Sequence, residues 1–179
     1  SSNVTGIIVD LTASDYQVTN DGFNNKDKLD GIEIIIGSGY ADLFTGDANS
    51  NTFVGGDGSD EFIASITASD TYYGNTIDAA NTYRADEFDK VDYQNLAKVS
   101  VDLSAVDATN GYVVAKKSTN ASASDDFSTY VEDYLYGIVN INGGSSKDTL
   151  IGNDEGNKLD GKAGNDTIEG KGGADILKG

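Results

Sequence analysis

The residues that could do chemistry in this sequence are seven Asp and Asn side chains that recur at intervals of nine within two blocks. Each one follows a glycine by five positions. They are Asp42, Asn51 and Asp60 in the first block, and Asp148, Asn157, Asp166 and Asp175 in the second. Their oxygens suit Ca²⁺, which accepts about six to eight oxygen ligands at irregular angles. The pattern therefore predicts calcium sites, with these side chains as the main ligands.

The overall composition also favours a cation as partner. The chain has 30 Asp and Glu residues against 12 Lys and Arg, a formal net charge of -18, and such a chain does not attract nucleic acid or an anionic membrane. The absence of His and Cys removes the commonest catalytic bases, the thiol nucleophiles and the usual ligands of zinc. No apolar run approaches the length of a membrane span. The sequence thus predicts no enzymatic activity, no nucleic-acid binding and no membrane insertion.

The repeats predict local structure as well as chemistry. Nonapeptides in one phase occupy residues 37–63 and 143–179, and the last residue, Gly179, would open a further repeat of a longer protein. Each nonapeptide begins with a glycine-rich sextet, which favours tight turns with positive φ, and ends in a triplet long enough for a short strand. One apolar residue per triplet points inward, so the core is thin and something besides apolar burial must hold the fold together. These residues are Phe44, Phe53, Phe62, Leu150, Leu159, Ile168 and Leu177.

Backbone carbonyls of the glycine turns are the expected second source of metal ligands. Mg²⁺ fits such turns less well than Ca²⁺, because it demands a tighter octahedron. Two rival interpretations are that the Asp and Asn residues only cap turns, or that the chain contains an EF-hand loop. Turn capping does not explain one phase shared by two blocks, and no EF-hand motif can be placed on the sequence. The turn positions expected to contribute are Gly37, Gly39, Gly55, Asp57, Gly143, Ser145, Gly152, Gly161, Ala163 and Gly170.

The nonapeptide pattern resembles the RTX (haemolysin-type) calcium-binding repeat, whose consensus is G-G-x-G-x-D-x-U-x with U a large apolar residue. The resemblance implies an all-β fold, namely a parallel β-roll (β-solenoid) with Ca²⁺ in its turns. In that fold two nonapeptides form one coil, so residues two repeats apart lie about 4.8 Å from each other. Two carboxylates stacked in this way repel by about 1 to 3 kcal/mol, and Ca²⁺ between them reverses the sign. The expected pairs are Asp42 with Asp60, Asp148 with Asp166, and Asn157 with Asp175, the last being the weakest because it carries one charge fewer.

An internal duplication organises the chain. Residues 28–42 align with residues 134–148 at a constant offset of 106, and Val9–Ala13 matches Val101–Ala105. Each copy therefore consists of a strand, a loop, a lead-in strand and a block of repeats. The predicted domains are a first RTX unit at 1–66, a connecting or capping segment at 67–98, and a second RTX unit at 99–179.

Several segments outside the repeats give weaker signals. Alternation of Ile32, Ile34 and Ile36 predicts a lead-in strand stacked on the first coil. Residues 116–126 are rich in Ser, Ala, Asn and Asp and are expected to form an exposed loop. Helix should be scarce, and Thr82–Leu96 is the one segment whose pattern suggests a short helix.

Tyrosines and acidic residues outside the repeats raise two further hypotheses. Tyr130, Tyr134 and Tyr136 could form an aromatic platform for a glycan or a peptide, although such residues more often flank a sheet. Two carboxylates can also form a glycosidase site without histidine. Nothing in the spacing of the available residues supports that chemistry, so we interpret them as solvated surface charges. The acidic residues concerned are Glu61, Glu132 and Asp133.

Calcium is expected to act as a folding switch. Without it, the net negative charge and the thin core cannot offset the chain entropy, so ion binding and folding become one event. The resemblance implies export through type I secretion as an unfolded chain and folding outside the cell, where calcium is abundant. We expect an extracellular structural module of a bacterial surface protein, an S-layer protein or an adhesin, whose partners are calcium ions and neighbouring copies or other domains of that protein. The alternatives are an accessory RTX module of a secreted polysaccharide-modifying enzyme, lipase or protease, and a glycan-binding module.

Overall fold

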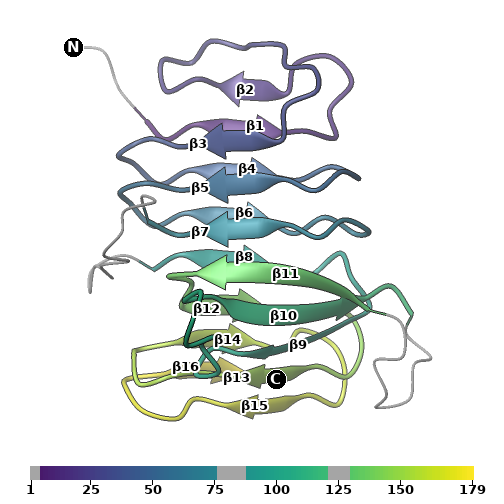
Figure 1. Cartoon of the computed structure of the whole chain (residues 1–179), viewed down its shortest axis with the longest axis vertical. Coiled ribbons are helices and arrows are strands. Elements are labelled where there is room, and N and C mark those ends of the chain that lie inside the picture. The colour runs from purple at the N-terminus through teal and green to yellow at the C-terminus, as the bar shows by residue number, and fades with distance from the viewer. Residues whose placement is uncertain (1–4, 76–87, 121–129) are drawn as a thin grey trace.

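The computed structural model describes residues 5–75, 88–120 and 130–179, and all regular structure in these residues is β-strand. Figure 1 shows the strands stacked into one elongated coil, with the N-terminal strands at one end and the second repeat block at the other. Within the described residues, sixteen short strands form two sheets of eight. Most neighbouring strands are parallel, so the fold is a parallel β-roll, and the predicted fold class is confirmed.

Each sheet takes strands from both repeat blocks. The first sheet runs β2 (Val18–Asn20), β1 (Ile8–Asp10), β4 (Leu43–Thr45), β6 (Glu61–Ile63), β8 (Lys90–Asp92), β12 (Asn140–Asn142), β14 (Lys158–Asp160) and β16 (Ile176–Lys178). The second sheet runs β3 (Ile34–Ile36), β5 (Thr52–Val54), β7 (Thr71–Tyr73), β11 (Val131–Tyr136), β10 (Val113–Ser118), β9 (Lys98–Asp102), β13 (Thr149–Ile151) and β15 (Thr167–Glu169). The two repeat blocks therefore share one continuous pair of sheets.

Successive repeats alternate between the two sheets, so one coil consists of two strands and two turns. Strand partners in a sheet are equivalent residues two repeats apart. Phe44 pairs with Phe62 in the first block, and Leu150 pairs with Ile168 in the second. The prediction that two nonapeptides make one coil is confirmed.

A file of inward side chains fills the space between the sheets. Phe44, Phe53 and Phe62 are fully buried. The ring centroid of Phe44 lies 5.6 Å from that of Phe53 and 5.7 Å from that of Phe62. Tyr72 continues the file, with its ring stacked 5.8 Å from Phe53. Full burial of one such side chain contributes about 1.5 to 3 kcal/mol, so this file is the main apolar support of the first block.

The segment between the repeat blocks contributes coils to the roll. In the first sheet β8 lies between β6 and β12, and in the second sheet β7 lies between β5 and β11. The described residues of 67–98 thus extend both sheets and do not cover an end of the roll. An antiparallel insertion, β9–β10–β11, then separates β7 from β13 in the second sheet. Because β11 is parallel to β7 and β9 is parallel to β13, strand direction is the same on both sides of the insertion.

The duplicated sequences occupy equivalent places. The first strand of each copy, β1 or β9, pairs in parallel with the strand that follows the first repeat turn of its block, and an antiparallel strand, β2 or β10, lies on its other side. The following turn is also repeated, because the hydroxyl of Thr12 donates to Asp10 and that of Ser104 donates to Asp102, each at 2.6 Å. The equivalent inward pairs are Val9 with Phe44 and Val101 with Leu150.

Part of the predicted lead-in strand exists as β3, but the alternation of Ile32, Ile34 and Ile36 does not mark its inward face. Ile35 is buried, whereas Ile34 and Ile36 are 64% and 69% exposed. Ile35 points inward because it pairs with Phe53 on the neighbouring strand. An uninterrupted run of three isoleucines hides this phase, so alternation alone could not reveal it.

Two other local predictions are wrong in their described parts. Of the predicted helix at 82–96, residues 82–87 lie outside the described residues, and the rest contains β8 and a turn. The predicted exposed loop at 116–126 begins inside β10, where Lys117 is buried. Residues 121–126 of that loop lie outside the described residues.

Replacing Phe62 by Ala should lower the free energy of unfolding by about 3 to 5 kcal/mol, because it leaves a cavity in the aromatic file. Urea unfolding in saturating calcium would measure this. The matched control is Phe23→Ala, since Phe23 is 60% exposed and its loss should change stability by less than about 0.5 kcal/mol. Equal effects of the two substitutions would contradict the packing described here.

Candidate calcium sites

The sixth-position side chains form two rows, because successive repeats lead into strands of different sheets. Most of them are buried although they are charged or polar; Asp42, Asp60 and Asp148 are at most 3% exposed. Asp166 and Asp175 are only partly buried, because they belong to the last two turns. Asp42, Asp60, Asn157 and Asp175 precede strands of the first sheet, and Asn51, Asp148 and Asp166 precede strands of the second.

The structure brings together the three pairs that the repeat spacing predicts. In each pair the backbone N–H of one residue donates to Oδ1 of its partner on the next coil. The donor–acceptor distances are 2.8 Å from Asp42 to Asp60, 2.9 Å from Asp148 to Asp166, and 3.0 Å from Asn157 to Asp175. The acidic side chains are therefore stacked along the roll, one coil apart.

The second side-chain oxygen faces the residue's own turn. Asp148 Oδ2 accepts a hydrogen bond from the backbone N–H of Gly144 at 2.7 Å, and Asp42 Oδ2 accepts one from Ser38 at 2.6 Å. Turn capping, the rival interpretation, is thus part of what these side chains do. It does not use all their capacity, because a carboxylate oxygen has more than one lone pair.

Side-chain and carbonyl oxygens converge beside the first glycine of several repeats. A side-chain carbon added to Gly143 would lie 2.5 Å from Asp148 Oδ2 and 2.9 Å from the carbonyl oxygen of Gly161 on the next coil. The same kind of pair, a side-chain oxygen of one coil and a glycine carbonyl of the next, surrounds Gly37 and Gly152. Only glycine leaves this space open, and two oxygens that face one space are a natural ligand set for a hard cation.

The donor set fits calcium better than a metal that needs several side chains. Within the described residues, no group of three or more acidic side chains is close enough to hold an ion. Most ligands would therefore be backbone carbonyls, with one or two carboxylates, an arrangement that Ca²⁺ accepts. Asp166 Oδ2 is buried without a hydrogen-bond partner in the described part of the chain, so it has the capacity to bind an ion.

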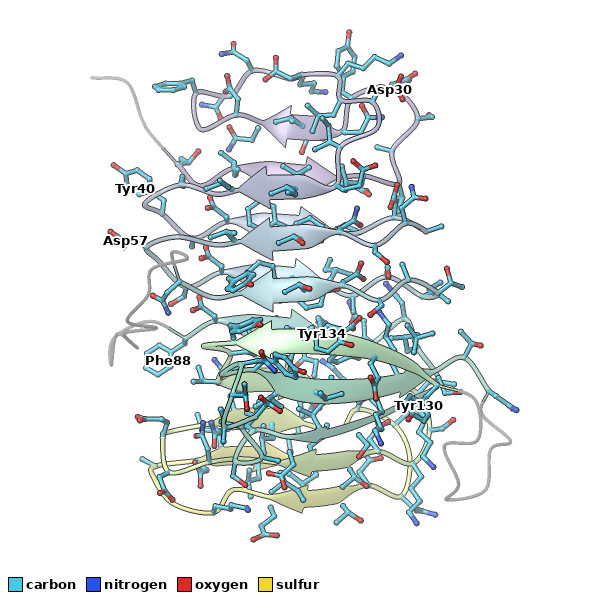
Figure 2. All side chains as sticks on the ribbon, in the orientation of Figure 1. Asp30, Tyr40, Asp57, Phe88, Tyr130 and Tyr134 are labelled. Atoms are coloured by element: carbon cyan, nitrogen blue, oxygen red, sulfur yellow. The ribbon has the colours of Figure 1, made fainter. Side chains whose placement is uncertain are left out.

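The turn positions predicted as additional ligands differ in their surroundings. Figure 2 shows Asp57 and Tyr40 at the outer edges of neighbouring turns. Asp57 is exposed, so its backbone carbonyl is better placed than its side chain to bind an ion in the turn. Ser145 donates its N–H to the carbonyl of Leu96 at 3.0 Å, because its turn lies against residues 93–97 and not against a repeat. The other predicted turn positions, Gly39, Gly55, Ala163 and Gly170, are backbone positions of the same stacked turns.

Burial changes the acid–base properties of these side chains. It raises the pKa of Asp148 to about 7, and the negative charge of Asp166 adds to this effect. Hydrogen bonds from the N–H groups of Val99 and Gly144 act in the opposite direction. A carboxyl group with such a pKa is readily protonated near neutral pH unless a cation binds to it.

Sequence reasoning missed residues that continue both rows. Asp60 donates its N–H to Asp89 Oδ1 at 2.8 Å, and Asn51 donates to Asp70 Oδ1 at 2.9 Å. Asp89 follows Asp60 by 29 residues and Asp70 follows Asn51 by 19, so inserted residues break the phase of the repeats. The signal that could have found them is the triplet after each Asp, Thr-Tyr-Tyr or Lys-Val-Asp, whose central residue points inward like that of a repeat.

The interpretation of the non-repeat acidic residues as surface charges is wrong for one of them. Asp133 is fully buried, and its Oδ1 lies 2.7 Å from Nζ of Lys117. Glu61 does lie at the surface, where it forms an ion pair with Lys90. The described arrangement places Asp133 in the core and Glu61 on the outer face of its strand, so they do not form a common glycosidase site.

Parallel coils of two nonapeptides, with stacked carboxylates and glycine carbonyls in their turns, define the protein as a calcium-binding β-roll. Comparison with protein families supports this class. Residues 29–62 and 142–177 match the family described as the RTX calcium-binding nonapeptide repeat (4 copies). These two segments belong to that family, they contain all seven predicted sixth-position residues, and calcium is their cofactor.

The remaining comparisons are brief. A comparison with curated proteins gave no match. In the described residues there is no helix long and apolar enough to cross a membrane.

Calcium affinity should fall as the pH is lowered from about 8 to about 6, because protons compete with calcium for Asp148. The folded pKa of Asp148 is raised from its ordinary 3.8 to about 7, so without calcium the folded state keeps a proton that the unfolded state loses, and its stability falls as the pH rises from about 4 through about 7. Calcium titrations followed by circular dichroism at several pH values would show the shift. The variant Asp148→Asn should weaken the pH dependence, and a calcium midpoint independent of pH would contradict this assignment.

Proposed function

We propose that this chain is a structural module of an exported bacterial surface protein, an S-layer protein or an adhesin, that folds outside the cell when calcium binds. Its repeats belong to a calcium-binding family. The proposed ligands are the sixth-position side chains together with the carbonyls of the glycine turns. The module contributes shape and spacing, and neighbouring copies or other domains of the same protein are its proposed partners.

The stacked, buried carboxylates are the observation that carries this proposal. Asp42 and Asp60 lie one coil apart and are at most 3% exposed, and Asp148 and Asp166 repeat the arrangement. Removing several carboxylates from water without a counter-charge costs more than their hydrogen bonds return. Calcium supplies that charge, so folding should require it.

Export as an unfolded chain is consistent with the same features. Extracellular calcium modules usually bind at about 10⁻⁴ to 10⁻³ M. The calcium concentration of the cytosol is far lower, so the chain would stay unfolded until export. The chain contains no cysteine, so no disulfide has to form during or after that step.

The host protein is the finer part of the proposal. An accessory module of a secreted enzyme would have the same repeats, and its flanking sequence would encode a catalytic domain. Further repeats or lattice-forming domains on either side would favour the surface protein. Sequencing the complete gene therefore decides between the two hosts.

A group of tyrosines supports glycan binding as a second candidate function. Tyr73 and Tyr136 stack with ring centroids 4.3 Å apart, and Tyr112 packs edge-on against Tyr134 at 4.9 Å. Figure 2 shows Tyr134 on the outer side of β11, and Tyr130 farther away, just before the N-terminal end of that strand. Only two of the three predicted tyrosines therefore belong to this group. Exposed aromatic faces can bind sugars, but these rings also bury one another.

Binding to a glycan array would test that second function. If the group binds sugar, wild type should give a signal that Tyr134→Ala reduces at least about tenfold, a loss of roughly 1.4 kcal/mol. Tyr16→Ala is the control, because Tyr16 is exposed between β1 and β2, at the N-terminal end of the roll. No signal for wild type would leave the tyrosines as a structural cover of the sheet.

The main proposal predicts a coil-to-sheet transition when calcium is added to the apo chain. Circular dichroism should show this transition with Ca²⁺ and little change with Mg²⁺, because Mg²⁺ fits the turns poorly. Asp60→Ala and Asp166→Ala should each move the calcium midpoint to higher concentration, since each removes a stacked carboxylate. Asp15→Ala removes the same charge from an exposed site outside the repeats and should leave the midpoint in place. A full sheet signal in excess chelator would refute the proposal.

A further inference from the structure

A buried group of charged and aromatic residues lies beside the antiparallel insertion, where Asp70, which continues one of the two rows, meets a buried lysine. Lys117 of β10 and Asp133 of β11 are at most 1% exposed. Lys117 Nζ lies 2.7 Å from Asp133 Oδ1 and 3.4 Å from Oδ2 of Asp70, the residue that precedes β7. Burying an ion pair removes two charges from water, and replacing it by apolar residues often stabilises a protein. The group therefore calls for a role beyond stability.

The carboxyl group of Asp133 is positioned so that its carbon can be attacked by a nucleophile. Its Oδ1 accepts a hydrogen bond from the backbone N–H of Asp70 at 2.9 Å, which would stabilise negative charge on that oxygen. Its Oδ2 is buried and makes no hydrogen bond with the described residues. Burial raises the pKa of Asp133 to about 7, although Lys117 opposes the shift. The carboxyl group can thus hold a proton more easily than a surface aspartate.

Asp70 is held in place to accept a proton from the lysine. Its Oδ2 accepts hydrogen bonds from the hydroxyl groups of Ser65 at 2.5 Å and Tyr72 at 3.1 Å. Asp70 and Tyr72 are both fully buried, so water does not compete for these contacts. A carboxylate fixed this close to an amine can move a proton between that amine and a leaving oxygen.

We propose that Lys117 and Asp133 form an intramolecular isopeptide bond, with Asp70 as the general base. In the buried pair a proton first passes from the Lys117 ammonium group to Asp133 Oδ2, which gives a neutral amine and a carboxylic acid. Lys117 Nζ then attacks Cγ of Asp133, and Oδ1 takes up the negative charge. Asp70 removes a proton from Nζ and transfers it to Oδ2, the bond between Cγ and Oδ2 breaks, and Oδ2 leaves as water. One ammonium and one carboxylate thereby give one amide and one water molecule, without an oxidant, a reductant or a metal.

The short distance between the two side chains and the exclusion of water from them both favour this reaction. A nucleophile held in contact with its target reacts as if it were at very high concentration. The product also replaces two buried charges with a neutral amide, which the core accommodates more easily. An ion pair elsewhere in the chain provides a comparison: Lys90 Nζ is also 2.7 Å from a Glu61 oxygen, but these side chains are 25% and 38% exposed. Water stabilises both ions there, so that pair stays ionic.

Intact-mass spectrometry of the purified chain under denaturing conditions tests the proposal. After folding, wild type should be about 18 Da lighter than its sequence mass, because one water has left. Protease digestion should yield one branched peptide that contains both Lys117 and Asp133. A folded wild type with the full sequence mass would overturn the proposal, whatever the behaviour of any variant.

Variants assign the roles. Lys117→Arg and Asp70→Asn should keep their full masses, while Asp133→Asn should lose about 17 Da as ammonia, because an amide can also be the leaving group. Glu61→Gln is the matched control and should still lose one water. Retention of the mass loss in Lys117→Arg would place the lost water elsewhere and refute the assignment. The inference does not depend on the proposed function, since circular dichroism reports calcium-dependent folding and mass reports the bond.

Discussion

The structure depends on carboxylates buried in turns where oxygen atoms of neighbouring coils face one another. Asp148 shows how contacts that favour a charged carboxylate oppose the cost of burying it. Its oxygens accept N–H groups from Val99 and Gly144, which favours the charged form. The same carboxylate also faces the carbonyl of Gly161, and burial penalises its charge. Calcium satisfies both sets of oxygens at once, and this is why the repeats combine glycine with aspartate.

The need for an ion follows from how little else the coils share. Each repeat contributes one inward side chain and a strand of three residues, so neighbouring coils bury little apolar surface. In such solenoids each coil contacts only its neighbours, and stability is the sum of local terms. The first block adds stacked Phe rings, whereas the second uses smaller aliphatic residues such as Leu150 and Leu159. The second block should therefore rely more heavily on its turns.

The repeats could be read from the sequence because their physical demands are local. Glycine at the turn, Asp before the strand and one apolar residue inside recur at fixed places, and the predicted pairing of Asp42 with Asp60 follows from counting. The nine-residue spacing does not lead to Asp70 and Asp89, which continue the rows. Inserted residues lengthen the chain before each of them, although each still precedes a strand of the roll. Contacts that depend on the whole fold were also hidden. Nothing near Lys117 in the sequence indicates that Asp70 and Asp133 surround it, since the three are brought together by three different segments.

The antiparallel insertion has a mechanical consequence. A roll of parallel coils that is pulled along its axis can unravel one coil at a time, because each coil is held by ladders only three residues long. The insertion interrupts that series with strands of five and six residues, β9, β10 and β11, which pair side by side over most of their length. Under tension the repeat blocks on either side would yield first. The centre of the roll would then act as a stop that keeps the unravelled ends connected to a folded body.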